Sequence, residues 1–170
     1  MGWILPFCRG IDPNWISLAL LPFGAMAAWA YGTGSFYLGA FFILVRMFLG
    51  TLDGLVAEHF HKGTPKGEIL NRLAPELCDA ALFGVFAFQD PLWGVPALCL
   101  CWLTTFSGLI GFTIGKKGES IGPAGQTDRL AALLICSILP FDIDWMRVFL
   151  IWCTIGGTAT VFLRLKRHFS

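Results

Sequence analysis

The chain has 170 residues, of which 56% are apolar and 15% aromatic while only 14% are charged, and its mean hydropathy is +0.70. Soluble globular domains carry about 25% charged residues, so this composition excludes an ordinary soluble domain. We predict an all-α, polytopic membrane protein that forms a single integral membrane domain over residues 1–170, since no linker or low-complexity stretch divides the chain.

Six apolar runs are separated by short polar or glycine-rich segments, and all but the fifth approach the length of about 20 residues that a bilayer span needs. Asp12-Pro13-Asn14 precedes the first run and can begin and cap a helix. The fifth run is the shortest. We predict six transmembrane helices in one bundle, over Trp15–Tyr31, Ser35–Phe60, Glu68–Phe88, Pro91–Ile114, Thr127–Leu139 and Trp145–Leu165.

Lysine and arginine residues are distributed unevenly among the predicted loops. With both termini on one face, that face receives ten of the twelve basic residues: Arg9, Lys62, Lys66, Arg72, Lys116, Lys117, Arg129, Arg164, Lys166 and Arg167. The opposite loops carry Asp90, Asp142 and Asp144 and no basic residue. Because cytoplasmic loops are enriched in Lys and Arg, we expect both termini to be cytoplasmic. We also expect the first apolar run to be an uncleaved span rather than a signal peptide.

Polar residues enter two neighbouring apolar runs. Arg46, Gly50, Asp53, Gly54 and Ala57 share roughly one side of the second predicted helix, since residues three and four apart lie on the same face. On the third helix, Asn71, Pro75 and Asp79 form a second stripe at steps of four. If two such stripes face each other, their carboxylates can hold Mg²⁺ or Mn²⁺, often together with substrate phosphates.

These residues resemble the signature of the CDP-alcohol phosphotransferase (CDP-alcohol phosphatidyltransferase) family. The signature is Asp-x-x-Asp-Gly-x-x-Ala-Arg followed, about eight residues later, by Gly-x-x-x-Asp-x-x-x-Asp. The corresponding segments here are Gly50-Thr51-Leu52-Asp53-Gly54-Leu55-Val56-Ala57-Glu58 and Gly67-Glu68-Ile69-Leu70-Asn71-Arg72-Leu73-Ala74-Pro75.

A bacterial branch of the family is more similar still. Its members carry Leu-Asn-Glu-Leu-x-Asp, then Ser-Asp-Ala-Ala-Leu, and later Gly-Pro-x-x-Lys-x-Asp-Arg. This chain has Leu70-Asn71-Arg72-Leu73-Ala74-Pro75, Cys78-Asp79-Ala80-Ala81-Leu82 and Gly122-Pro123-Ala124-Gly125-Gln126-Thr127-Asp128-Arg129. The resemblance therefore spans most of the chain, and it implies a bacterial inner (plasma) membrane protein.

The chain departs from the signature at three of its four aspartates, which are Gly50, Asn71 and Pro75, so that only Asp53 remains. In the family these aspartates bind metal, and the last is thought to act as the base. Proline can do neither, and it kinks a helix. A kink at Pro75 would turn Glu76 or Asp79 toward the site.

The resemblance and the polar stripes together yield a set of candidate site residues. The predicted catalytic residues are Asp53, Asp79 and Glu76, and the predicted ligands of Mg²⁺ or Mn²⁺ are Asp53, Asn71 and Asp79. Gly54, Ala57, Gly67, Lys116, Lys117 and Arg129 are the predicted substrate-binding residues. Two alternatives stay open: Lys116 and Lys117 can be ordinary cytoplasmic-loop lysines, and Arg46 can pair with Asp79 rather than bind phosphate.

The resemblance implies an enzyme of phospholipid biosynthesis that transfers a phosphatidyl or substituted phosphate group from a CDP-linked donor to an alcohol acceptor and releases CMP. Its expected partners are CDP-diacylglycerol or another CDP-alcohol, an alcohol acceptor, membrane lipids and a second copy in a homodimer. No nucleic-acid partner is expected. The alternative is a catalytically inactive relative that binds a lipid or nucleotide or acts as a scaffold, which the missing aspartates favour.

Overall fold

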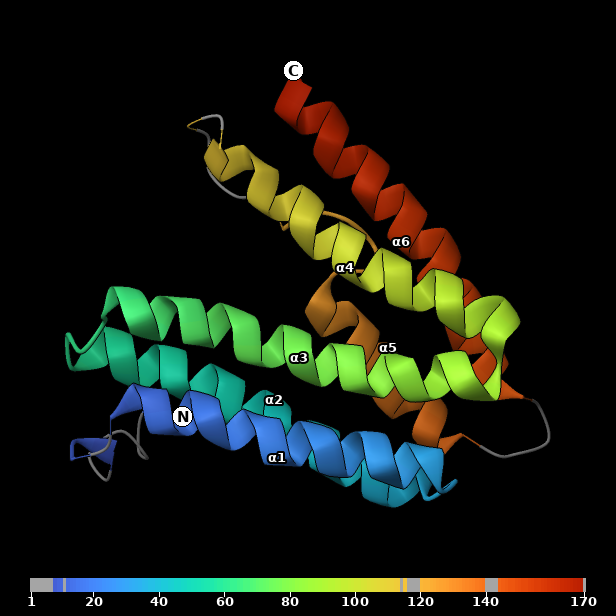
Figure 1. Cartoon of the computed structure of the whole chain (residues 1–170), viewed down its shortest axis with the longest axis horizontal. Coiled ribbons are helices and arrows are strands. Elements are labelled where there is room, and N and C mark those ends of the chain that lie inside the picture. The colour runs from blue at the N-terminus through green and yellow to red at the C-terminus, as the bar shows by residue number, and fades with distance from the viewer. Residues whose placement is uncertain (1–7, 11, 114, 116–119, 140–143, 170) are drawn as a thin grey trace. The chain divides into compact units, whose positions relative to one another are not determined.

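The computed structural model describes residues 8–10, 12–113, 115, 120–139 and 144–169, and within them every regular element is a helix. The six helices are α1 (Pro13–Gly32), α2 (Phe36–His59), α3 (Pro65–Gln89), α4 (Pro91–Thr113), α5 (Gln126–Ile138) and α6 (Trp145–Phe169) (Figure 1). The all-α prediction is confirmed, and each predicted span corresponds to one of these helices.

In the part of the chain that the structure describes, four helices, α1, α2, α4 and α6, are long and apolar enough to cross a membrane. Only 33–44% of their most apolar windows is buried inside the protein, and large side chains such as Trp15, Phe41 and Phe106 are exposed. This outward apolar surface is what a lipid environment requires, so the chain is a membrane protein. The prediction of six spans is confirmed only for these four helices.

The two remaining helices differ from typical spans for separate reasons. At a rise of 1.5 Å per residue, the 13 residues of α5 extend about 20 Å, which is shorter than a hydrocarbon core of ~30 Å. Helix α3 is long enough, with 25 residues, but it carries Lys66, Glu68, Arg72 and Glu76 along its first half and Asp79 just beyond. Whether α3 and α5 also span the bilayer stays a prediction.

The chain divides into two compact units, unit 1 (Met1–Leu82) and unit 2 (Phe83–Ser170). The single domain expected from the sequence stays a prediction. In unit 1, α1 begins at Pro13, where the Asp12 side chain accepts a hydrogen bond from the Asn14 N–H at 3.0 Å. A short turn with Gly34 at φ +77° then reverses the chain into α2, and α1 and α2 pack along each other (Figure 1).

Small residues allow close packing in both units. In unit 1, Gly24 of α1 lies so near Cys78 of α3 that a Cβ at position 24 would come within 2.3 Å of the Cys78 Sγ. In unit 2, α4 packs against α6, where a Cβ at Gly157 would lie 3.0 Å from that of Leu100. Phe83, Phe86 and Phe149 form an aromatic cluster with ring centroids about 6 Å apart.

Candidate functional site

A cavity of about 490 Å³ opens in unit 1 where α1 begins, α2 ends and α3 begins. It draws residues from all three helices and from the α2–α3 loop. Its lining consists of Pro13, Asn14, Ser17, Asp53, Gly54, Ala57, Glu58, Lys62, Gly63, Thr64, Pro65, Gly67, Glu68 and Asn71. Five of the predicted site residues, namely Asp53, Gly54, Ala57, Gly67 and Asn71, are therefore brought together, although they come from two different helices.

Asp53 is the buried carboxylate of the cavity, with a relative exposure of 1%. The Ser17 hydroxyl donates a hydrogen bond to its Oδ2 at 2.7 Å, and the Gly54 N–H donates to its Oδ1 at 2.6 Å. Both donors are neutral, so the carboxylate is oriented but its charge is not cancelled by these bonds. Hydrogen bonds to an ionised acceptor are stronger than those between neutral groups, so Ser17 of α1 fixes the Asp53 side chain of α2.

The first turn of α3 closes the other side of the cavity. Thr64 caps this helix: its Oγ1 accepts from the Gly67 N–H at 3.0 Å and its carbonyl accepts from Glu68 N at 2.9 Å. A Cβ at Gly67 would lie 2.7 Å from the Asn14 Oδ1, so the glycine lets the Asn14 side chain approach the α3 backbone. This close approach explains physically why the signature position is a glycine here.

Gly54 differs from Gly67 in its surroundings. A Cβ at Gly54 would meet no other atom within 4 Å, although this residue lines the cavity. The missing side chain therefore leaves room for a ligand rather than for packing. Any side chain placed at position 54 would extend into open cavity space beside the Asp53 carboxylate.

The exposed rim of the cavity carries charges of both signs. The Lys62 Nζ donates to the Arg9 carbonyl at 2.7 Å and lies 5.6 Å from the centre of the Phe60 ring. Glu58, which stands where the family signature has arginine, is exposed beside it. Because Lys62 is a cation on an otherwise acidic lining, it is the group best suited to contact a phosphate at this rim.

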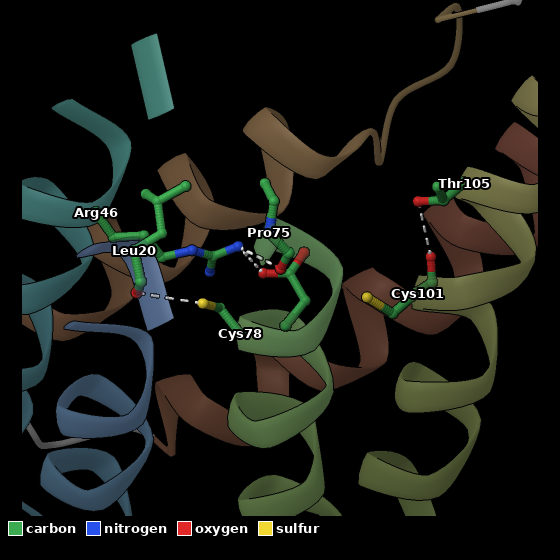
Figure 2. Close-up of polar contacts among 7 residues, drawn as sticks. Leu20, Arg46, Pro75, Cys78, Cys101 and Thr105 are labelled. Carbon is green, nitrogen blue, oxygen red and sulfur yellow. Dashed lines mark hydrogen bonds and ion pairs between the residues drawn. The ribbon is translucent and has the colours of Figure 1, made fainter. Parts of the chain in front are cut away.

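Asp79 lies elsewhere in unit 1, in a buried ion pair with Arg46. The Arg46 Nη2 lies 2.6 Å from the Asp79 Oδ1, and the two side chains are 3% and 1% exposed. The same Nη2 donates to the Pro75 carbonyl at 2.7 Å (Figure 2). Asp79 is not among the residues that line the cavity, so of the two alternatives for Arg46 the structure shows the pairing with Asp79. A catalytic or metal-binding role for Asp79 stays a prediction.

The other predicted site residues are distributed as follows. Glu76 is half-buried on α3 and does not line the cavity. Lys116 and Lys117 lie outside the described residues. Arg129 belongs to unit 2, where it is 2% exposed and its Nη1 donates to the Thr104 Oγ1 at 2.6 Å and to the Ala124 carbonyl at 2.9 Å.

In unit 2, the segment Gly122–Gly125 is held by side chains of α5 and α6. Arg164 of α6 donates to the carbonyl of Ile121 at 2.8 Å and to that of Thr104. Thr160 accepts from the Ala124 N–H at 3.1 Å. A Cβ at Gly122, whose φ is +129°, would come within 2.4 Å of the Thr160 side chain. The Gly-Pro segment therefore owes its conformation to two buried arginines and a threonine, of which Arg129 was singled out from the sequence.

Asn14, Ser17 and Lys62 line the cavity but were not predicted from the sequence as site residues. A signal for the first two was present, because Asn14 and Ser17 are three residues apart at the polar start of an otherwise apolar helix. Ser17 was the stronger clue, since a hydroxyl that faces the interior of a membrane helix bundle needs a hydrogen-bond partner. Lys62 had no such signal, because loop lysines are expected on the basic face in any case.

The residues present do not fit the pair of metal ions that the family signature implies. Among the residues that the structure describes, no group of three or more His, Cys, Asp or Glu side chains is arranged to hold a metal ion. Asp53 is the one signature carboxylate in the cavity, and Asp79 faces Arg46 instead. A single ion would need most of its ligands from a bound phosphate.

Long apolar helices with exposed apolar side chains define a membrane protein, and a cavity formed by α1, α2 and α3 carries an Asp-Gly pair on one wall. Comparison with known families identifies it further: the family model for CDP-alcohol phosphatidyltransferase matches residues 11–160. The chain belongs to the CDP-alcohol phosphatidyltransferase family, as the resemblance of its motifs predicted.

Individual relatives agree with this assignment. The inner membrane protein YnbA of Escherichia coli (strain K12) is 29% identical over 181 aligned positions, which cover 96% of this chain and 89% of that protein. The phosphatidylinositol phosphate synthase of Mycobacterium tuberculosis with CDP-DAG bound has the same fold, with a TM-score of 0.87 at 19% identity over 100% of this chain and 95% of the synthase. Its complex with manganese and citrate gives a TM-score of 0.85 at 16% identity, over 98% and 88% of the two chains.

Proposed function

We propose that this protein is an integral membrane phosphotransferase of phospholipid biosynthesis that binds a CDP-linked donor in the cavity of unit 1. The observation that carries the proposal is the Asp53-Gly54 pair, in which a buried, oriented carboxylate lies beside open space in a chain of this family. The fold relative from Mycobacterium tuberculosis, which holds CDP-DAG, supports a donor of this kind. The acceptor is an alcohol, and a bacterial inner membrane with cytoplasmic termini remains the expected location.

The cavity residues suit each part of the reaction. An acceptor hydroxyl attacks the β-phosphorus of the donor, a new P–O bond forms, the P–O bond to the nucleotide breaks, and CMP leaves. The Asp53 carboxylate, fixed by Ser17 and Gly54, accepts the hydroxyl proton. The Lys62 ammonium group at the rim offsets the negative charge of the phosphates.

The expected Mg²⁺ or Mn²⁺ remains part of the proposal at the level of the family, since the fold relative was also obtained with manganese. Because the cavity lacks the carboxylate ligands for two ions, no step of the mechanism is assigned to a metal. Glu76, Asp79, Arg129, Lys116 and Lys117 remain proposed site residues, and no step of the mechanism is assigned to them.

The test is CMP release by the purified protein with CDP-diacylglycerol and a panel of acceptor alcohols, measured in Mg²⁺, in Mn²⁺ and in EDTA. Asp53→Asn removes the proposed base and should lower turnover at least ~100-fold, the lower end for loss of a general base. Asp90→Asn is the matched control, because Asp90 pairs with Arg147 in unit 2 and does not line the cavity. Equal activity of the two variants would rule out Asp53 as the base.

A second candidate function is donor binding without turnover. The observation in its favour is that Gly50, Asn71 and Pro75 leave Asp53 as the one signature carboxylate, while Asp79 is paired with Arg46. Under this alternative, no acceptor gives CMP release, but CDP-diacylglycerol still raises the melting temperature.

Gly54→Leu provides the binding test for both functions. The leucine fills the cavity beside Asp53 and should abolish the rise in melting temperature with CDP-diacylglycerol. Gly84→Leu is the control, since Gly84 is also a helical glycine at which a Cβ meets nothing within 4 Å. Donor binding that persists in Gly54→Leu would place the donor elsewhere.

A further inference from the structure

The Arg46–Asp79 pair lies next to the signature positions, with Arg46 four residues before Gly50 on α2 and Asp79 four residues after Pro75 on α3. Pro75 stands at the position of the last signature aspartate. In place of a carboxylate, this position offers its backbone carbonyl, which accepts from the Arg46 Nη2 at 2.7 Å (Figure 2). The acceptor that replaces the aspartate is therefore bound by a cation of this chain.

The pair is also a direct polar link between two helices. Arg46 belongs to α2, whereas its two acceptors, the Asp79 carboxylate and the Pro75 carbonyl, belong to α3. Both charged side chains are almost completely buried, at 3% and 1% exposure. Removing one partner of such a pair leaves an uncompensated charge in a low-dielectric interior, which is strongly unfavourable.

A metal site between α2 and α3 would both bind a ligand and join the two helices. In this chain the cavity provides the space for a ligand, and the Arg46–Asp79 pair joins the helices. A divalent ion that joins two helices needs carboxylates from both, and the described part of α3 presents only the Asn71 amide and the Glu68 carboxylate to the cavity. Glu68 is 68% exposed and lies 2.9 Å from Arg72. The buried α3 carboxylate, Asp79, is instead neutralised by Arg46.

We propose that Arg46 is a built-in cation that joins α2 to α3, so that the folded state of unit 1 does not depend on a divalent metal. The guanidinium group neutralises Asp79 and binds the Pro75 carbonyl. The proposal concerns the ligand-free protein, and it holds whether or not the protein releases CMP.

The first experiment measures the thermal unfolding of the purified full-length protein, without nucleotide or lipid donor, in EDTA and in MnCl₂. The melting temperature of the wild type should differ between the two by less than about 2 °C. A rise of more than about 5 °C in Mn²⁺ that Asp53→Asn abolishes would show that a metal makes the link, and it would overturn the proposal.

The second experiment compares Arg46→Met with the double variant Arg46→Met/Asp79→Leu. Arg46→Met leaves Asp79 buried without its cation, so the melting temperature should fall by roughly 6–20 °C. The double variant removes both charges and should recover at least about half of that loss. If the two variants are equally unstable or equally unfolded, the pair is not an energetic unit and the proposal fails.

CMP release separates this inference from the proposed function. A wild type that is insensitive to EDTA in unfolding but inactive in turnover supports the built-in cation and contradicts the transferase. A wild type that is active but unfolds in EDTA supports the transferase and contradicts the built-in cation.

Discussion

Unit 1 contains two buried aspartates, Asp53 and Asp79, that have the same exposure of 1% and opposite surroundings. Asp53 accepts hydrogen bonds from a serine hydroxyl and a backbone N–H and faces a cavity. Asp79 faces the guanidinium group of Arg46 away from that cavity. The comparison shows that burial does not decide whether a carboxylate is available for chemistry. The charge of its partners does, because neutral donors orient the group while a cation neutralises it.

The largest expected effect is a difference in the free energy of unfolding between substitutions at the two aspartates. Asp79→Asn leaves the Arg46 charge buried without a counter-ion and should lower the free energy of unfolding by about 3–5 kcal/mol. Asp53→Asn weakens hydrogen bonds from neutral donors and should cost about 1–3 kcal/mol. Thermal or SDS-induced unfolding in a fixed detergent gives both values. Equal losses would contradict the distinction between the two sites.

Ser17→Ala tests whether Asp53 is oriented from α1. The variant removes the 2.7 Å bond to the Asp53 Oδ2, and we expect turnover to fall roughly tenfold, which corresponds to about 1.4 kcal/mol in the transition state. Ser17→Thr retains the hydroxyl and should restore most of the activity. If Ser17→Thr is as impaired as Ser17→Ala, the shape of the side chain at this buried position rather than the hydrogen bond is responsible.

Gly67→Ala sharpens the comparison by disturbing the cavity without changing a charge. Its Cβ would lie 2.7 Å from the Asn14 Oδ1, and since that side chain can turn, the cost should be about 1 kcal/mol. The half-saturating concentration of CDP-diacylglycerol should rise while the Arg46–Asp79 pair is untouched. Gly84→Ala is the control, because Gly84 also lies on α3, does not line the cavity, and has nothing within 4 Å of an added Cβ.

The smallest effect is expected at the exposed ion pair of Glu68 and Arg72, which are 68% and 51% exposed. Arg72→Gln should change the free energy of unfolding by no more than about 0.5 kcal/mol, because water screens a pair at the surface. The same unfolding measurement checks it. A loss comparable with that of Asp79→Asn would show that exposure does not set the strength of these pairs.

The helices were predictable because the chain marks their ends with strong local signals. Pro13, Pro65 and Pro91 begin helices, and the apolar runs between the polar segments match the observed helices within a few residues. The number of spans was less certain from the sequence, because α5 is short and α3 carries four charged residues in its first half. Length and charge, rather than periodicity, distinguish these two helices from the others.

The site was predictable where it rests on a local motif and less so where it depends on packing between helices. Asp53, Gly54, Gly67 and Asn71 follow from motif spacing and meet in one cavity. Ser17 was missed because its partner lies 36 residues away on another helix. The partner of Asp79 could be proposed but not decided, since a stripe of polar residues on one helix does not specify which group on the next helix it faces.

The bond between Lys62 and the Arg9 carbonyl has a practical consequence for handling the protein. A lysine that lines the cavity is held by the backbone just before α1. We therefore expect an affinity tag or fluorescent fusion at the amino terminus to disturb this hydrogen bond and, at the proposed donor site, to weaken substrate affinity without touching any motif residue. Fusions placed after α6, in unit 2, leave this hydrogen bond alone and are the better choice for binding assays.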